Sequence, residues 1–148
     1  MLLGDCAIGY TDKGETFCID IEDLDRVKEY HWIKNSKGYY IAHNRNTDKY
    51  MRLHRLILSP SPDKIVDHIN HDVSDNRKSN LRICTNAENS WNNKCTGYHW
   101  DKRLKKWRVA ITVNGKVITI GYFLSEQEAK IARKVAEQSY WGEFAFKE

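Results

Sequence analysis

Side chains destined for two opposite faces alternate strictly from residue 106 to residue 113, and a second strand-like run, residues 116–123, follows an Asn-Gly pair. A period of two is typical of strands that bury one face. The pair Asn114-Gly115 predicts a two-residue hairpin turn, because both positions tolerate positive φ. Equal spacing from this turn predicts three facing pairs: Val113 with Lys116, Ile111 with Ile118, and Val109 with Ile120.

A helical pattern follows the hairpin, and Ser125 and Glu128 have the spacing of a capping box. Mostly small residues form its predicted inner stripe: Ala129, Ala132, Val135, Ala136 and Tyr140. With residues 97–102 as a third strand, we expect a three-stranded antiparallel sheet that one helix covers on one side. The uncovered face would meet solvent or a partner, and would carry Arg108, Ala110, Thr112, Val117, Thr119 and Gly121.

The chain ahead of two prolines, Pro60 and Pro62, predicts short strands around one helix. Strand patterns occupy residues 15–20, 38–43 and 49–54. Apolar residues after the first strand recur at helical spacing: Leu24, Val27 and Tyr30. The prolines interrupt any regular element, so we place a boundary there.

Residues 66–93 mix short polar side chains with apolar anchors, which a plain loop does not explain. Residues 66–69 and 81–84 predict two strands joined by a long polar connection, and Thr85 is a candidate N-cap for a helix that follows. The predicted fold class is therefore α+β. Three regions are predicted: a β-rich segment with one helix at 1–58, a central motif at 59–96, and the sheet with its helix at 97–148.

Strand, loop, strand and helix form a frame that would aim Asp67 and His68 at the first turns of a helix carrying Asn89 and Asn93. Carboxylate and amide oxygens suit a hard cation such as Mg²⁺, with Mn²⁺ as an alternative. Such an ion stabilises charge on a phosphate. A histidine, whose ordinary pKa is near neutral, can deprotonate the attacking water. The chemistry indicated is metal-assisted phosphodiester hydrolysis.

These residues resemble the HNH endonucleases with the ββα-metal fold, in the phage and bacterial form that carries "LHRLI", "VDHIN", "DNR" and "NLR" followed by spaced asparagines. The resemblance covers residues 53–94. It implies Asp67 and Asn89 as metal ligands, His68 as general base, Asn80 as the residue that fixes the loop, and Asn93 as an extra ligand or phosphate contact. The family usually has Gly where this chain has His71, at a turn that favours positive φ. His71 is either a surface residue or a contact to phosphate or a softer metal.

Residues 97–145 resemble the Apetala-type (ethylene-response-factor) DNA-binding domain, which lays its uncovered sheet face in the major groove. The resemblance therefore implies double-stranded DNA as the partner. It places these residues on the DNA: His99, Lys102, Arg103, Lys105, Lys106, Arg108, Thr112 and Thr119. Near the central motif, Arg77 and Arg82 could bind phosphates as forked donors, with surface salt bridges as the alternative.

Composition sets limits on other functions. The 148 residues carry a net charge of +4, so affinity for a polyanion requires clustered charge. The first residues do not resemble a signal peptide, and no apolar run approaches the ~20 residues that span a bilayer. The cysteines form no C-x-x-C pair, which favours reduced thiols over a disulfide or scattered zinc site: Cys6, Cys18, Cys84 and Cys95.

The sequence thus predicts an intracellular, metal-dependent DNA endonuclease of homing type, from a bacterium or a phage-infected host, acting as a monomer or weak dimer. Two alternatives stay open: a DNA-binding regulator with an inactive HNH site, and a structural zinc module. His54 could assist the site or be a packed histidine, and Asp67 with His68 alone would be an ordinary strand-end pair.

Overall fold

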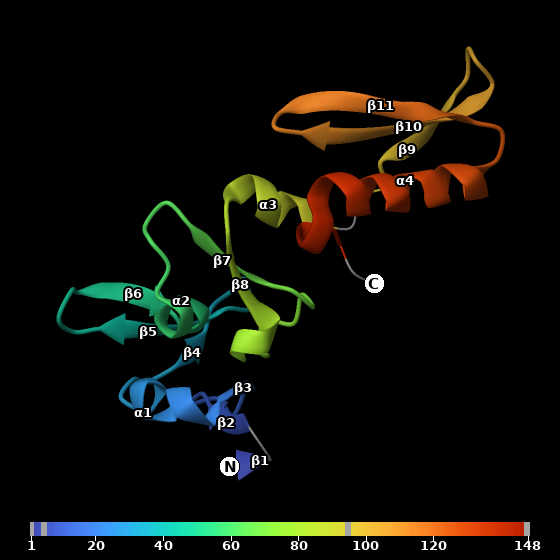
Figure 1. Cartoon of the computed structure of the whole chain (residues 1–148). Helices are drawn as coiled ribbons and strands as arrows, with labels where there is room; N and C mark the ends of the chain where they lie inside the picture. Colours follow the sequence, from blue (N-terminus) through green and yellow to red (C-terminus); the bar gives the residue numbers. More distant parts are fainter. Residues whose placement is uncertain (1, 4–5, 94–95, 147–148) are drawn as a thin grey trace. The chain divides into compact units, whose positions relative to one another are not determined.

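The computed structural model describes residues 2–3, 6–93 and 96–146. The chain divides into two compact units, Met1–Thr85 and Asn86–Glu148 (Figure 1). The boundaries near residues 58 and 96 stay predictions from the sequence. Small antiparallel sheets and short helices make up both units, so the predicted α+β class is confirmed. Within the described residues, no helix is long and apolar enough to cross a membrane.

The first unit begins with a three-stranded sheet in the order β1 (Leu2–Leu3), β2 (Cys6–Tyr10) and β3 (Thr16–Asp20). The predicted strand at 15–20 is thus present. The predicted helix after it is short, and consists of the 3₁₀ turn η1 (Ile21–Asp23) and α1 (Leu24–Val27).

A second sheet contains β4 (Ile33–Lys34), β5 (Tyr40–Asn44) and β6 (Lys49–Arg52). The strand expected at 49–54 stops two residues early, because α2 (Leu53–Leu58) begins there. Leu53, His54 and Ile57 are buried at helical spacing, so the helix places in the core three side chains that a strand would divide between two faces.

Two strands of the central motif pair as the sequence predicted. β7 (Ile65–His68) runs antiparallel to β8 (Leu81–Cys84), with Asp67 opposite Arg82 and His68 opposite Leu81. The connection between them ends in the 3₁₀ turn η2 (Lys78–Asn80). The core beneath these strands gathers apolar residues from the whole unit, among them Ile19, Trp32, Tyr40, Leu53, Val66 and Leu81.

The second unit starts with α3 (Asn86–Trp91), followed by a sheet in which β10 (Lys106–Val113) lies between β9 (Tyr98–Asp101) and β11 (Lys116–Phe123). Helix α4 (Glu126–Trp141) packs on β10 and β11, and the short η3 (Gly142–Phe144) follows it (Figure 1). The three-stranded sheet, its helix and the Ser125–Glu128 capping box are all as predicted. Trp91 of α3 stacks on Trp141, with ring centroids 5.8 Å apart.

The hairpin register is as predicted near the turn and wrong beyond it. Val113 faces Lys116 and Ile111 faces Ile118, but a β-bulge shifts the register so that Val109 faces Gly121. The outer face consequently carries Tyr122, which lies opposite Arg108, in place of the predicted Gly121.

The inner stripe of α4 also differs from the prediction. Val135 and Tyr140 are 61% and 46% exposed, whereas Arg133 is buried. The Arg133 guanidinium donates to the Ala110 carbonyl and to Glu137, and lies 4.7 Å from the centroid of the Trp141 ring. A charged residue therefore occupies the buried stripe because it is fully paired there, which periodicity of apolar residues does not reveal.

Candidate functional site

His68 is the last residue of β7, and its side chain is buried, at 5% exposure. Its Nε2 lies 3.2 Å from Asn76 Oδ1, while Asn76 Nδ2 donates to the Val73 carbonyl at 3.0 Å. That second bond sets the orientation of the amide and turns its oxygen to the imidazole. An amide oxygen only accepts, so Nε2 carries the proton and the lone pair of the neutral ring is on Nδ1.

Burial lowers the pKa of His68 below its ordinary value, and this effect outweighs the stabilisation of the charged ring by Asn76, Asp67, Asp72 and Asp75. At neutral pH the ring is therefore uncharged. A neutral imidazole with one protonated and one unprotonated nitrogen is the form that can accept a proton from water.

Two aromatic rings line His68. His54 of α2 packs edge-on against it at 5.1 Å between centroids, and Tyr39 lies 6.4 Å from it and 5.4 Å from His54. Arg52 covers the Tyr39 ring at 5.1 Å. Burial lowers the pKa of His54 to about 3, and the nearby His68, Arg52 and Arg55 make smaller contributions in the same direction. His54 is thus a neutral packing partner of His68.

Residues 69–80, the connection that follows His68, are here called the 69–80 loop. Asn80, its last residue, forms hydrogen bonds to the start and the middle of this loop. Its side-chain oxygen accepts from Asn70 N at 3.0 Å, and its Nδ2 donates to the Asp75 carbonyl at 2.8 Å. Its own carbonyl accepts from Ile69 N at 2.9 Å. The side chain is buried, so these bonds hold the chain next to His68 in one conformation.

Arg77, predicted to contact phosphate, forms a fork with a carboxylate of the same loop. Its Nε and one terminal nitrogen donate to the two oxygens of Asp75 at 2.8 and 2.7 Å. This partner lowers the pKa of Asp75. The guanidinium is 44% exposed, so the pair reinforces the loop and keeps one side toward solvent.

Asp67, a predicted metal ligand, is paired with Arg82, a predicted phosphate contact. Arg82 donates from Nε at 3.1 Å and from a terminal nitrogen at 2.8 Å to Asp67 Oδ2. Both side chains are only 11% exposed. The pair neutralises the Asp67 carboxylate in its partly buried position.

Asn89 and Asn93, the other predicted metal ligands, belong to the second unit. Asn89 is half-buried on α3, and Asn93 is exposed just beyond the end of that helix. The amide nitrogen of Asn93 lies 3.4 Å from the Asn89 carbonyl and 3.2 Å from that of Ser90. A carboxylate and amide oxygens are a donor set that fits a hard divalent cation. Among the residues that the structure describes, no three His, Cys, Asp or Glu side chains converge as a metal-binding group, and Cys95 lies outside them.

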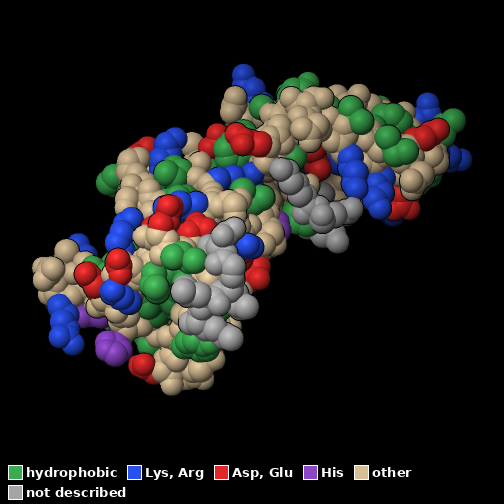
Figure 2. Space-filling view, turned by 60° about the horizontal axis from the view of Figure 1, so that its bottom comes forward, with side chains coloured by type: hydrophobic (Ala, Val, Ile, Leu, Met, Phe, Trp, Pro, Cys, Tyr) green, Lys and Arg blue, Asp and Glu red, His purple; other side chains and the backbone are tan. Residues whose placement is uncertain are grey.

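The predicted DNA contacts of the C-terminal sheet lie along its outer face and the turn between β9 and β10. Arg108 donates to Thr119 Oγ1 at 2.9 Å, and His99 and Tyr122 flank Arg108 on the neighbouring strands. Thr112 is exposed. The turn exposes a run of cations: Lys102, Arg103, Lys105 and Lys106. Figure 2 shows Lys and Arg side chains spread among acidic and uncharged ones over the face in view.

Comparison with known proteins finds a family match in the central segment. Residues 53–91 match the family model described as HNH endonuclease. An uncharacterised HNH endonuclease of Acanthamoeba polyphaga mimivirus is 27% identical over 143 residues, which span 90% of this chain and 74% of that protein. No solved structure matches the chain.

The HNH match begins at α2 and ends at α3, so it contains His54, His68, the 69–80 loop and Asn89. The C-terminal sheet lies beyond it. Two residues beside His68 were not predicted from sequence: Asn76 and Tyr39. Asn76 stands within the "DNR" triplet that supports the HNH resemblance, and this triplet was a usable signal. Tyr39 is the residue immediately before β5, and nothing in the sequence around it indicates a place beside His68.

Proposed function

We propose that this chain is a metal-dependent endonuclease that hydrolyses phosphodiester bonds in duplex DNA. The observation that carries the proposal is the setting of His68: a buried, neutral imidazole whose Nε2 donates to Asn76, at the head of a loop fixed by Asn80. This setting lies inside the segment that matches the HNH endonucleases.

In the proposed reaction His68 is the general base. Nδ1 accepts a proton from the water whose oxygen forms the new bond to phosphorus, and the bond to the leaving 3′-oxygen of the sugar-phosphate chain breaks at the other side. The leaving oxygen takes up a proton from solvent water and becomes the 3′-hydroxyl. The resulting imidazolium keeps its Nε2–H bond to Asn76, which stabilises the charged ring. By the HNH resemblance, the products carry 5′-phosphate and 3′-hydroxyl ends.

A divalent cation, Mg²⁺ or Mn²⁺, would stabilise the negative charge that develops on the phosphate and the leaving oxygen. The proposal assigns Asp67 and Asn89 as its ligands and Asn93 as an additional one. Support for this set comes from its oxygen chemistry and from the HNH resemblance. Because Arg82 donates to Asp67, the carboxylate is held in position before any cation binds.

The C-terminal sheet is proposed to position the nuclease on DNA, as in the Apetala-type domains it resembles. Its outer face offers Arg108, Thr119, Thr112 and His99, and the neighbouring turn offers Lys102, Arg103 and Lys105. Cations of this kind hold phosphates, and binding should weaken steeply with salt as counterions are released. A homing role in a phage or bacterial setting is proposed from the HNH resemblance.

A second candidate function is favoured by one observation, the pairing of Asp67 with Arg82. If that pair excludes a cation, the chain is a DNA-binding regulator with an inactive nuclease site. A supercoiled-plasmid assay with Mg²⁺, Mn²⁺ or EDTA separates the two. The nuclease predicts metal-dependent nicking that is lost in His68→Ala and retained in His31→Ala, a matched change at a histidine whose side chain is 89% exposed. Salt-sensitive binding without cleavage under any metal would support the regulator.

A further inference from the structure

The N-terminal strands have no part in the proposed reaction, yet β3 contacts the 69–80 loop at two points. At the first point the contact is between backbones. Cys18 N donates to the Ser74 carbonyl at 2.8 Å, and Asn76 N donates to the Cys18 carbonyl, also at 2.8 Å. The residue whose side chain holds His68 is therefore itself fixed to β3 through its main chain.

At the second point the contact is from a side chain. Asp20, the last residue of β3, accepts from the backbone N–H of Lys78 through Oδ2 at 2.7 Å. Lys78 is the first residue of η2, whose last residue is Asn80. The N-cap residue of η2 is Arg77, whose side chain makes no cap bond. The Asp20 carboxylate, 58 residues away from Lys78, therefore supplies the acceptor that a local cap would supply.

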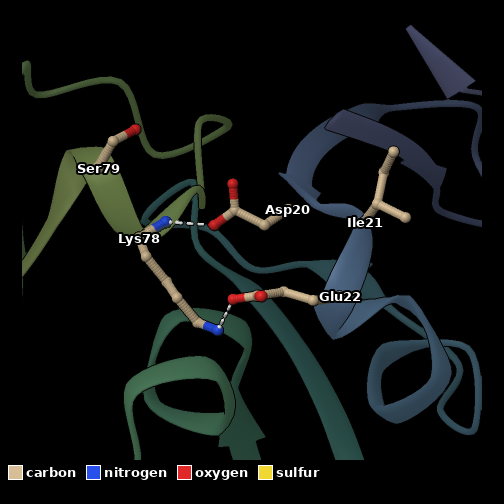
Figure 3. Close-up of a pocket in the computed structure, with 5 residues that line it drawn as sticks. All are labelled: Asp20, Ile21, Glu22, Lys78 and Ser79. Atoms are coloured by element: carbon tan, nitrogen blue, oxygen red, sulfur yellow. Dashed lines mark hydrogen bonds and ion pairs between the residues drawn. The ribbon is translucent and has the colours of Figure 1, made fainter. Parts of the chain in front are cut away.

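A surface ion pair lies beside this bond. Figure 3 shows Asp20 and Glu22 approaching Lys78 from the same side, with Asp20 at its backbone and Glu22 at its ammonium group. The buried Asp23 also lies near the ammonium, at 3.1 Å, and has Arg26 as a second cation at 3.7 Å. Glu22 is 68% exposed, so its bond to Lys78 contributes little to stability. The two bonds to one residue can therefore be separated by substitution.

We propose that Asp20 is a positioning residue for the nuclease site: by capping η2 it fixes Asn80 and the 69–80 loop, and through that loop it holds Asn76 against His68. The path follows hydrogen bonds and the chain itself: from Asp20 to Lys78 N, through η2 to Asn80, from Asn80 Nδ2 to the Asp75 carbonyl, and on to the adjacent Asn76. The inference rests on the proposed function for its catalytic consequence. It gives the N-terminal sheet a role as the support of the loop.

Two variants remove the same bond from opposite sides. Asp20→Ala removes the acceptor. Lys78→Pro removes the donor, and proline is suited to the first position of a helical turn, where the preceding Arg77 already has an extended backbone, φ −68° and ψ 144°. Lys78→Ala is the matched control, because it removes the same side chain and keeps the N–H. Glu22→Ala removes only the surface ion pair.

Two readouts test the inference. The first is the rate of single-turnover cleavage at saturating DNA and metal, and the second is the long-range ¹H–¹⁵N spectrum of the His68 imidazole. Asp20→Ala and Lys78→Pro should each lower the cleavage rate roughly 10- to 100-fold with unchanged DNA affinity, since displacement of a supporting shell costs that much. Their His68 signals should move from the Nε2–H tautomer toward an average of the two. Lys78→Ala and Glu22→Ala should match the wild type, and Asp20→Asn, which keeps an acceptor oxygen, should restore most of the rate.

The double variant Asp20→Ala/Lys78→Pro should be no slower than either single one, because both changes remove one interaction. Wild-type rates and an unchanged His68 spectrum in Asp20→Ala and Lys78→Pro would overturn the inference. So would equal losses in Lys78→Pro and Lys78→Ala. If the wild type cleaves no DNA, the proposed function fails, and the His68 spectrum alone then decides whether Asp20 positions the ring.

Discussion

His68 and Asn76 are joined by one hydrogen bond of 3.2 Å that leaves the imidazole only one neutral tautomer. Asn76 can do this because its own Nδ2 is bound to the Val73 carbonyl and its N–H to Cys18. A base beside a scissile phosphate requires such a defined lone pair. The same bond also makes clear which substitution should be most informative.

Asn76→Ala should lower the cleavage rate roughly 10- to 100-fold, as loss of a residue that orients a catalytic group does. The His68 ring would lose the acceptor for Nε2–H and populate both tautomers. Single-turnover rates with excess enzyme would measure the effect. Asn46→Ala, at an exposed position of the β5–β6 turn, is the control and should leave the rate unchanged. An Asn76→Ala variant as fast as the wild type would show that the bond has no catalytic role.

Acid should destabilise the first unit through His54. Its pKa is about 3 in the folded protein and 6.5 ordinarily, so the unfolded chain binds the additional proton. The stability from the neutral ring is complete above pH 6.5 and is lost as pH falls toward 3, by at most about 1.4 kcal/mol per pH unit. Urea unfolding between pH 7 and pH 4 measures this slope.

His54→Phe keeps a ring in the core and removes the titrating group, so its unfolding free energy should fall less over the same pH range. His31→Phe, at an exposed histidine, should retain the wild-type slope. Equal slopes in all three proteins would mean that His54 is not the group responsible.

Arg82→Met should destabilise the metal-free protein by about 2–3 kcal/mol, because it leaves the partly buried Asp67 carboxylate without its cation. If Asp67 is a metal ligand, Mg²⁺ should recover part of this loss and raise the Tm of Arg82→Met more than that of the wild type. Arg77→Met, which likewise leaves the Asp75 carboxylate without its cation, should show no such recovery. Identical Mg²⁺ shifts in Arg82→Met and the wild type would count against Asp67 as a ligand.

His71 adopts φ 64°, in the left-handed region, as expected for a position where the family usually has Gly. Replacing it by Gly should stabilise the protein by about 0.5–1 kcal/mol, since a side chain is unfavourable there. His31→Gly, at a position without positive φ, should not stabilise. Thermal unfolding compares the two. A change of metal preference in His71→Gly, measured by cleavage in Mg²⁺ and Mn²⁺, would instead give His71 a part in the site.

Local patterns predicted much of the fold. The β10–β11 hairpin and the α4 capping box follow from alternation, an Asn-Gly turn and a Ser-to-Glu spacing, all of which act within a few residues. The misses depend on tertiary packing. Helix α2 replaces a strand because its buried residues meet the core, and Arg133 is buried because a distant carbonyl accepts from it.

The candidate site divides in the same way. The positions of Asp67 and His68 at the end of a strand, and the bonding of Asn80 across the loop, could be predicted from spacing along one short segment. The bond between His68 and Asn76 could not, because it depends on Cys18, 58 residues earlier in the chain. For Arg82 the sequence had left a salt bridge open as the alternative to phosphate binding, but it did not name Asp67 as the partner.

Chemical rescue tests the central claim, that His68 is the general base of DNA hydrolysis, most directly. His68→Gly would be assayed on plasmid DNA in Mg²⁺ with increasing imidazole, beside Asp67→Ala treated in the same way. The account predicts metal-dependent cleavage that is lost in His68→Gly, returns with imidazole, and does not return in Asp67→Ala. Cleavage by His68→Gly at the wild-type rate without imidazole would contradict it.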